Sequence, residues 1–256
     1  FAMDEKDGYL RIATTTGEMW RTDEYASANN IYVMDSSLTI VGSVEGLARN
    51  EQIKSVRFLG TRAYMVTFRT TDPLFVIDLS NPAAPAVLGE LKIPGFSEYL
   101  HPYGENLLIG FGQDAAEVGD RAYALGLKVS MFDVSDTANP KEIATLYLGD
   151  RGSYTELLYN HKALLSDPEG GLLGFPVTLA AVPDNMKQDP SAYGYQVYSG
   201  FVVLAYQDSA FQVRGFVSHI DGADPYRRFA NTAEAEAFMN QEAGKIWSEP
   251  VFRGVT

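Results

Sequence analysis

The sequence contains no cysteine. This absence excludes disulfide bonds, thiolate metal sites and cysteine nucleophiles. Histidine is rare: only His101, His161 and His219 occur, and none stands in a His-x-His or His-Glu-x-x-His pattern, so their spacing predicts no metal site. A Gly-x-Ser-x-Gly motif is also missing, which makes a serine hydrolase a poor interpretation.

Basic residues are scarce as well. Lysine and arginine total 20 against 33 aspartates and glutamates, a formal net charge of -13. An acidic surface repels phosphate backbones, so we expect no nucleic-acid partner. No apolar run approaches the roughly 18 residues that a membrane-spanning helix needs. We therefore expect any membrane attachment or export signal to belong to segments outside this sequence.

Short apolar runs make up most of the chain, bounded by Gly, Pro, Asn or Asp. Such runs are typical of β-strands; examples are Tyr9–Ala13, Ile31–Met34, Ala63–Phe68, Leu74–Leu79, Leu107–Phe111, Lys128–Val134 and Phe201–Tyr206. Only Thr232–Ala243 has helical character, with Thr232 as the expected N-cap and Gly244 at the C′ position. The pattern predicts an all-β protein.

An internal repeat indicates the architecture. The segment Val76–Pro85 recurs as Met131–Pro140, and partial copies occur at Val33–Ser37 and Tyr206–Ser209. In each copy an aspartate ends a strand, where its carboxylate can accept hydrogen bonds from turn amides. The proline of the longer copies begins the next strand, where no backbone donor is needed. This repeat predicts a β-propeller of four-stranded antiparallel blades.

Counting outward from these turns predicts about four blades and the start of another. The expected limits are residues 1–47, 53–93, 97–148 and 154–220, then a loop with a short helix over 221–249 and a further first strand over 250–256. A blade cannot bury both faces alone. We therefore expect part of a larger ring, with a closed four-bladed ring as the alternative.

Four stretches resemble a known family. Gly8–Thr15, Phe75–Ser80, Pro94–Tyr103 and Leu148–Tyr154 are similar to secreted bacterial and archaeal proteins with a C-terminal β-propeller domain, distantly related to WD40 repeats. The resemblance implies a propeller fold and an extracellular or cell-envelope location. It implies no activity, because it brings no catalytic motif, and Pro225–Trp247 departs from it.

Long connections between the second and third strands of a blade (B–C connections) supply the candidate binding surface. The sequence predicts them at Thr16–Asn29, Gln113–Leu125 and Val182–Gln196, and loops on a rigid scaffold often carry function. The candidate binding residues are Trp20, Arg21, Tyr25, Asp114, Arg121, Tyr123, Tyr193 and Tyr195. Aromatic rings among mixed charges suit a protein or carbohydrate ligand; the alternative is that these loops only pack on one another.

A second group of polar residues falls at equivalent positions on the expected first strands. Arg57, His101 and Ser166 are predicted to line the channel, where they could hold an anion or water; a solvated wall without a ligand is the plainer interpretation. Asp184 and Asp189 are candidate calcium ligands, although no complete calcium-loop pattern surrounds them. We expect no other metal or cofactor.

The sequence favours an extracellular binding or scaffold module that uses the face with the long B–C connections. The alternative is a propeller enzyme that acts on glycans as a hydrolase or lyase, or that carries a cofactor at the channel mouth. Propellers host both classes, so the fold does not decide between them. No residue is assigned a catalytic role.

Overall fold

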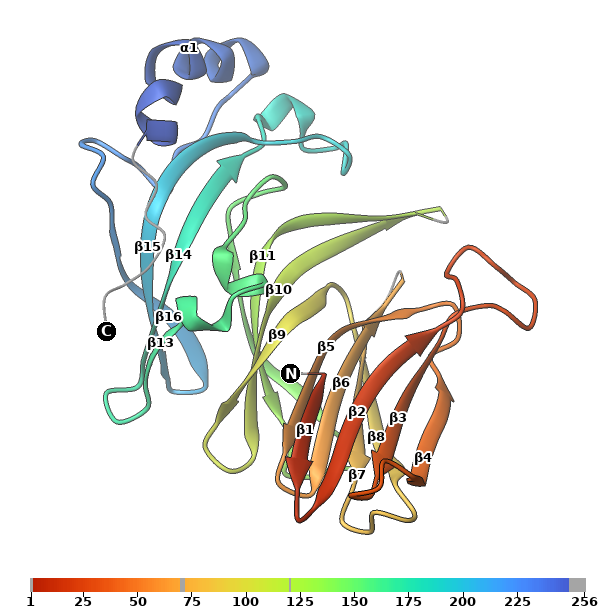
Figure 1. Ribbon diagram of the computed structural model, residues 1–256. Helices are drawn as coiled ribbons and strands as arrows, with labels where there is room; N and C mark the ends of the chain where they lie inside the picture. The colour runs from red at the N-terminus through yellow and green to blue at the C-terminus, as the bar shows by residue number, and fades with distance from the viewer. Residues whose placement is uncertain (1, 70–71, 120, 249–256) are drawn as a thin grey trace. The chain divides into compact units, whose positions relative to one another are not determined.

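The computed structural model describes residues 2–69, 72–119 and 121–248, and its strands form four sheets of four strands each (Figure 1). The first sheet contains β1 (Met3–Lys6), β2 (Tyr9–Thr16), β3 (Ala28–Met34) and β4 (Ile40–Leu47). The second contains β5 (Gln52–Leu59), β6 (Arg62–Phe68), β7 (Asp72–Asp78) and β8 (Ala86–Ile93). The third sheet contains β9 (Phe96–Tyr103), β10 (Leu107–Val118), β11 (Arg121–Asp133) and β12 (Lys141–Leu148). The fourth contains β13 (Leu165–Asp167), β14 (Leu172–Ala181), β15 (Tyr195–Gln207) and β16 (Ala210–Val217). Consecutive strands are neighbours in every sheet, which confirms the predicted four-stranded antiparallel blades.

The chain divides into two compact units. The first comprises Phe1–Gly110 and Met131–Glu142, and the second comprises Phe111–Ser130 and Ile143–Thr256. The third sheet, β9 to β12, supplies residues to both units.

The core of the first unit shows why its sheets stack. Successive side chains of a strand point to opposite faces. On β6, Tyr64 and Val66 join a buried cluster on one face, whereas Ala63 and Met65 join a different cluster on the other. The second sheet is therefore buried on both faces, as expected for a blade between two neighbours.

Glycines on the outer strands leave space for the turns of the following blade to pack closely. Gly42 on β4 pairs with Val33, and Gly89 on β8 pairs with Val76, each beside a β-bulge. A Cβ atom on Gly42 would lie 2.3 Å from the carbonyl oxygen of Pro82. Glycine therefore occupies equivalent positions of two blades, where the absence of a side chain permits close packing.

The aspartate turns form the hydrogen bonds that the repeat predicted. The Asp78 Oδ1 atom accepts from the Ser80 amide at 2.8 Å, and the Asp133 Oδ1 atom accepts from the Ser135 amide at 2.9 Å. The fourth copy differs, because Asp208 and its neighbour have φ angles of 52° and 61° and close a two-residue hairpin.

Two regions of the second unit differ from the sequence prediction. The prediction of an irregular loop over Gln113–Leu125 is wrong, because β10 and β11 continue through this region as a long hairpin. The fourth sheet begins at Leu165 instead of near Tyr154. Before it, the side chains of Thr155 and Asn160 cap two short 3-10 helices, η1 (Glu156–Leu158) and η2 (His161–Ala163), and this local capping competes with strand pairing.

The helix after the last sheet is longer than predicted. Helix α1 covers Thr232–Ser248, so the prediction that Gly244 ends it is wrong. Its cap is Asn231, whose Oδ1 atom accepts from the Glu234 amide at 3.1 Å, and not Thr232. Among the described residues, no helix has the length and apolar character needed to cross a membrane. The first strand predicted over 250–256 lies outside the described residues.

Candidate functional site

The candidate site is a hollow of about 310 Å³ in the second unit, which we call the hairpin hollow. Three chain segments form it: the β10–β11 hairpin, the connection that follows β12, and the connection between β14 and β15. Its lining residues are Asp114, Leu125, Gly126, Tyr147, Gly149, Asp150, Arg151, Val182, Lys187, Asp189, Pro190 and Ala192. Two of the three segments are B–C connections that the sequence singled out.

Close backbone approaches fix these segments to one another. A Cβ atom on Gly126 would lie 2.0 Å from the carbonyl oxygen of Gly149, so only glycine fits this point of the hairpin. The Asp150 Oδ2 atom accepts from the Val182 amide at 2.8 Å, and the Gly194 amide donates to the Arg151 carbonyl at 2.7 Å. The wall of the hollow is therefore built from hydrogen-bonded backbone.

Arg151 is the central cation of the hairpin hollow. Its guanidinium carbon lies 4.3 Å from the ring centroid of Tyr193 and 5.3 Å from that of Tyr123, so both rings flank it. One Nη atom donates to the Ala124 carbonyl at 3.3 Å. The buried Nε atom has no hydrogen-bond partner among the described residues, and their carboxylates approach this guanidinium no closer than a longer-range charge interaction with Asp189. The described residues use only one Nη donor of this guanidinium, so its other Nη donors are left for a ligand.

Two acidic side chains of the β14–β15 connection, Asp184 and Asp189, have local partners. The Asp189 Oδ1 atom accepts from the amide and the hydroxyl of Ser191, at 2.8 and 2.6 Å. These hydrogen bonds, with a smaller contribution from the charge of Arg151, lower the pKa of Asp189. Asp184 pairs with the Lys187 ammonium at 3.1 Å. Within the described ranges, no three acidic or histidine side chains gather as a metal site would require.

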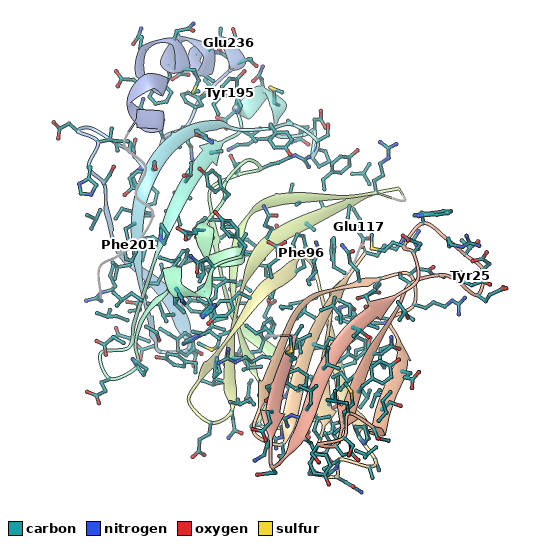
Figure 2. The ribbon with its side chains drawn as sticks, viewed as in Figure 1. Tyr25, Phe96, Glu117, Tyr195, Phe201 and Glu236 are labelled. Atoms are coloured by element: carbon teal, nitrogen blue, oxygen red, sulfur yellow. The ribbon has the colours of Figure 1, made fainter. Side chains whose placement is uncertain are left out.

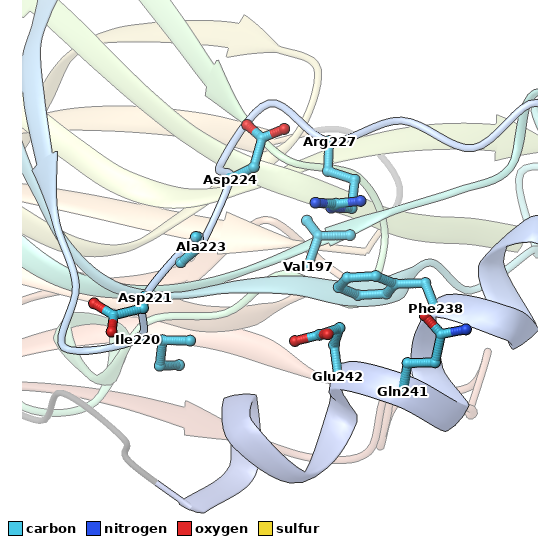
Figure 3. Close-up of a pocket in the computed structure, with 10 residues that line it drawn as sticks. Val197, Ile220, Asp221, Ala223, Asp224, Arg227, Phe238, Gln241 and Glu242 are labelled. Carbon is cyan, nitrogen blue, oxygen red and sulfur yellow. The ribbon is translucent and has the colours of Figure 1, made fainter.

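Two further hollows of the second unit adjoin the first through shared lining residues. The middle hollow, about 210 Å³, shares Gly149, Asp150, Val182 and Lys187 with the hairpin hollow. Its other lining residues are Ala180, Ala181, Val197, Pro225, Tyr226, Arg227 and Arg228. The helix hollow, about 320 Å³, lies between α1 and the segment that follows β16, and shares Val197 and Arg227 with the middle hollow (Figure 3).

Arg227 stands where the middle and helix hollows meet. Its guanidinium carbon lies 4.5 Å from the ring centroid of Phe238 on α1 (Figure 3). In the part of the chain that the structure describes, its buried Nε atom finds no acceptor. Asp221, Asp224 and Glu242 make the helix hollow acidic, so Arg227 separates an acidic hollow from a more basic one.

The residues predicted for the binding surface divide among several places. Asp114 lines the hairpin hollow, and Tyr123 and Tyr193 flank its arginine. Arg121 is exposed at the start of β11 and is not among the residues that line the hollow. Tyr195 points toward the α1 region, where its ring packs edge-on at 6.3 Å from that of Phe229 (Figure 2).

Sequence reasoning missed Asp150 and Arg151 as site residues. They occupy the connection between the third and fourth sheets, which belongs to the same face as the B–C connections in a propeller. The sequence of Gly149–Gly152 contains a usable signal, because two glycines flank an Asp-Arg pair. In the structure these glycines have φ angles of 63° and 105°, a region that favours glycine. A tight turn that presents two charges at this face is a candidate site.

Trp20, Arg21 and Tyr25 form a separate cluster in the first unit, on the loop between β2 and β3, and Figure 2 labels its Tyr25. The Arg21 guanidinium lies 5.5 Å from the Trp20 ring and 4.9 Å from the Tyr25 ring. Unlike Arg151, this arginine has a carboxylate partner, because its Nε and Nη atoms both donate to Asp23. The ion pair neutralises the cluster.

The predicted channel residues also divide between the units. Arg57 on β5 and His101 on β9 lie in the first unit, where these strands contact each other, whereas Ser166 on β13 lies in the second. The His101 Nδ1 atom is 2.9 Å from the Tyr99 hydroxyl. Burial, and after it the charge of Arg57, lowers the pKa of His101. Whether these side chains line a channel stays a prediction.

Comparisons with known proteins agree with the architecture. The family model described as "Beta propeller domain" matches residues 1–243. An uncharacterised protein of Methanocaldococcus jannaschii is 55% identical over 143 residues, which are 56% of this chain and 21% of that protein. An uncharacterised protein of Archaeoglobus fulgidus is 44% identical over 176 residues, 69% of this chain and 25% of that protein. The chain thus matches only a fifth to a quarter of the length of these curated relatives.

Proposed function

Because this chain belongs to the beta propeller domain family, we propose that it is a binding module that holds a carbohydrate in the hairpin hollow. The observation that carries the proposal is Arg151, fixed between the rings of Tyr123 and Tyr193 with donors unused by the described residues. A fixed arginine beside exposed aromatic rings suits the hydroxyl groups and apolar faces of a sugar.

The geometry around Arg151 supports a preformed site. Tyr193 is 64% exposed, so its ring can contact a ligand as well as the guanidinium. Tyr147, which lines the hollow itself, is 54% exposed and offers a further aromatic surface. Since hydrogen-bonded backbone positions the walls, little ordering would be required on binding, and preorganisation of this kind favours affinity.

We propose an extracellular or cell-envelope location for this module, on the strength of its resemblance to secreted propeller proteins. Glycans are abundant ligands in that location. The acidic composition and the absence of cysteine are compatible with the proposal and do not carry it.

Isothermal titration calorimetry with a panel of neutral and acidic hexasaccharides tests the proposal. We expect at least one of them to bind, and Tyr193→Ala or Arg151→Gln to weaken that binding about tenfold or more, in line with loss of an aromatic or charged hydrogen-bonding contact. Trp20→Ala is the matched control, because Trp20 is 76% exposed beside a different, ion-paired arginine. Trp20→Ala should leave the affinity unchanged.

The absence of binding by every oligosaccharide would overturn the carbohydrate proposal. Equal loss of binding in Trp20→Ala and Tyr193→Ala would show that binding is not specific to the hairpin hollow. Chromatography of the recovered oligosaccharides separates binding from the enzymatic alternative, since a hydrolase or lyase would shorten them.

A further inference from the structure

The middle hollow differs in charge from the chain that surrounds it. It is lined by three basic side chains, Lys187, Arg227 and Arg228, and by one carboxylate, Asp150. The whole chain has 20 basic against 33 acidic residues, so this local excess of positive charge reverses the general balance. A basic hollow on an acidic protein is a candidate site for an anionic group.

Among the described residues, neither Arg227 nor Arg228 forms an ion pair, although Asp221, Asp224 and Glu242 line the helix hollow that Arg227 also borders. The carboxylate of Asp150 already accepts a hydrogen bond from the Val182 amide. Arg227 packs against the Phe238 ring, and its buried Nε atom has no acceptor among the residues that the structure describes. Lys187 has a partner in Asp184, but that carboxylate is 56% exposed and does not line the middle hollow. Arg227 is half-buried, and its Nη atoms make no hydrogen bond or ion pair with the described residues, so an anionic ligand in the hollow would supply a partner for them.

The adjoining hairpin hollow has the opposite character. Its lining carboxylates, Asp114, Asp150 and Asp189, outnumber its basic side chains, Arg151 and Lys187. Carboxylates accept hydrogen bonds from sugar hydroxyls, whereas they repel an anionic group. Because the two hollows share four lining residues, one ligand could present its hydroxyl groups to the first and its charge to the second.

We propose that the ligand is an acidic glycan whose carboxylate or sulfate group occupies the middle hollow against Lys187, Arg227 and Arg228. The inference rests on the proposed carbohydrate binding and names the class of glycan. Arginine suits this role, since its planar guanidinium can donate two parallel hydrogen bonds to a carboxylate or sulfate.

Paired probes that differ only in charge test the inference. For carboxylate, these are a galacturonic acid hexasaccharide and its carboxyl-reduced form; for sulfate, a sulfated dextran hexasaccharide and its unsulfated form. We expect one acidic probe to bind about tenfold tighter than its neutral counterpart, the size of one good charged hydrogen bond. The acidic probe that binds identifies the anionic group.

The variants assign that preference to the middle hollow. The variant Arg228→Gln should lower the affinity for the acidic probe toward that for its neutral counterpart, while neutral binding is unchanged, because Arg228 lines the middle hollow and not the hairpin hollow. Arg227→Gln should have the same effect, and Arg227→Lys should retain part of the preference. Arg21→Gln is the control for the loss of a positive charge, because Arg21 is paired with Asp23 in the other unit. Circular dichroism and melting temperatures check that each variant folds.

Equal affinity for acidic and neutral probes would overturn the inference and leave carbohydrate binding intact. A preference for acidic probes that survives in both Arg227→Gln and Arg228→Gln would also overturn it. Failure of every probe to bind would instead overturn the proposed function on which the inference rests.

Discussion

A Cβ atom on Gly89 would lie 2.3 Å from the carbonyl oxygen of Thr137, in the turn between β11 and β12. Gly89 pairs with Val76 beside a β-bulge, and Gly215 on β16 pairs with Val203 beside an equivalent bulge. No described atom lies within 4 Å of a Cβ atom built on Gly215. The same position in two sheets is therefore crowded in one and open in the other.

This contrast predicts opposite effects of one substitution. Gly89→Ala should destabilise the protein by about 1–3 kcal/mol, the usual cost of overpacking, because the turn that contains Thr137 must move. Gly215→Ala should leave stability unchanged or raise it by up to about 1 kcal/mol, since alanine lowers the entropy of the unfolded chain. Chemical denaturation of both variants measures the difference. Equal loss of stability would show that glycine is needed for the bulge and not for the close approach.

The repeated aspartate turns carry a second prediction. Asp78→Ala and Asp133→Ala should each cost about 0.5–2 kcal/mol, comparable to the loss of a helix-capping side chain. Glu105→Ala is the control, because Glu105 is exposed in another turn of the first unit. Hydrogen bonds from Ser135 lower the pKa of Asp133, so its contribution should be present near neutral pH and be lost as the pH falls through that lowered value. Denaturation midpoints equal to those of the parent would show that these turns do not stabilise the fold.

The repeat allowed the sheets to be predicted because it is local. An aspartate that ends a strand, followed by Ser or Asn and then Pro, fixes a turn whatever lies around it, and two such turns define the blade length between them. The hairpin of β10 and β11 was missed because its local sequence is misleading. Polar residues such as Asp114 and Glu117 resemble a loop in sequence, although they lie within β10, which is hydrogen-bonded to β11 in the third sheet.

The site was only partly predictable, because it depends on contacts between distant segments. Tyr123 and Tyr193 were chosen for their residue type, and nothing in their own segments indicated that Arg151 would lie between them. Gly126 carries no signal by itself, since its need for glycine comes from the Gly149 carbonyl. Long-range packing of this kind is not encoded in a local pattern.

The ion pair between Arg11 and Asp4 predicts a large effect in the first unit. Arg11 is 3% exposed; its Nε atom donates to Asp4 at 2.7 Å, and one Nη atom donates to the Gly60 carbonyl at 2.7 Å. Asp4→Asn should cost about 2–3 kcal/mol, because it leaves a buried charge without a carboxylate. Asp7→Asn removes an exposed pair with Lys6 and should change stability by less than about 1 kcal/mol. Similar stability of the two variants in denaturation experiments would contradict the importance of the buried pair.

The last prediction concerns the titration of His101. Burial and the charge of Arg57 lower its pKa, so the imidazole should titrate below the ordinary value of about 6.5. Because the folded state then binds a proton less readily than the unfolded chain, the histidine contributes stability that is present above about pH 6.5 and is lost as the pH falls through its lowered pKa. Heteronuclear NMR of the imidazole measures the pKa, and denaturation at several pH values measures the stability.

Arg57→Gln tests the cause. It removes one of the two effects, so the pKa of His101 should rise but stay below that of a free histidine, since burial remains. The same charge lowers the pKa of Tyr99, which burial raises, so Arg57→Gln should move the pKa of Tyr99 further upward. Both shifts have the same sign, because a nearby cation disfavours protonated imidazole and favours phenolate. A pKa of His101 that does not change in Arg57→Gln would show that the guanidinium lies too far from the ring, or is too well solvated, to act on it.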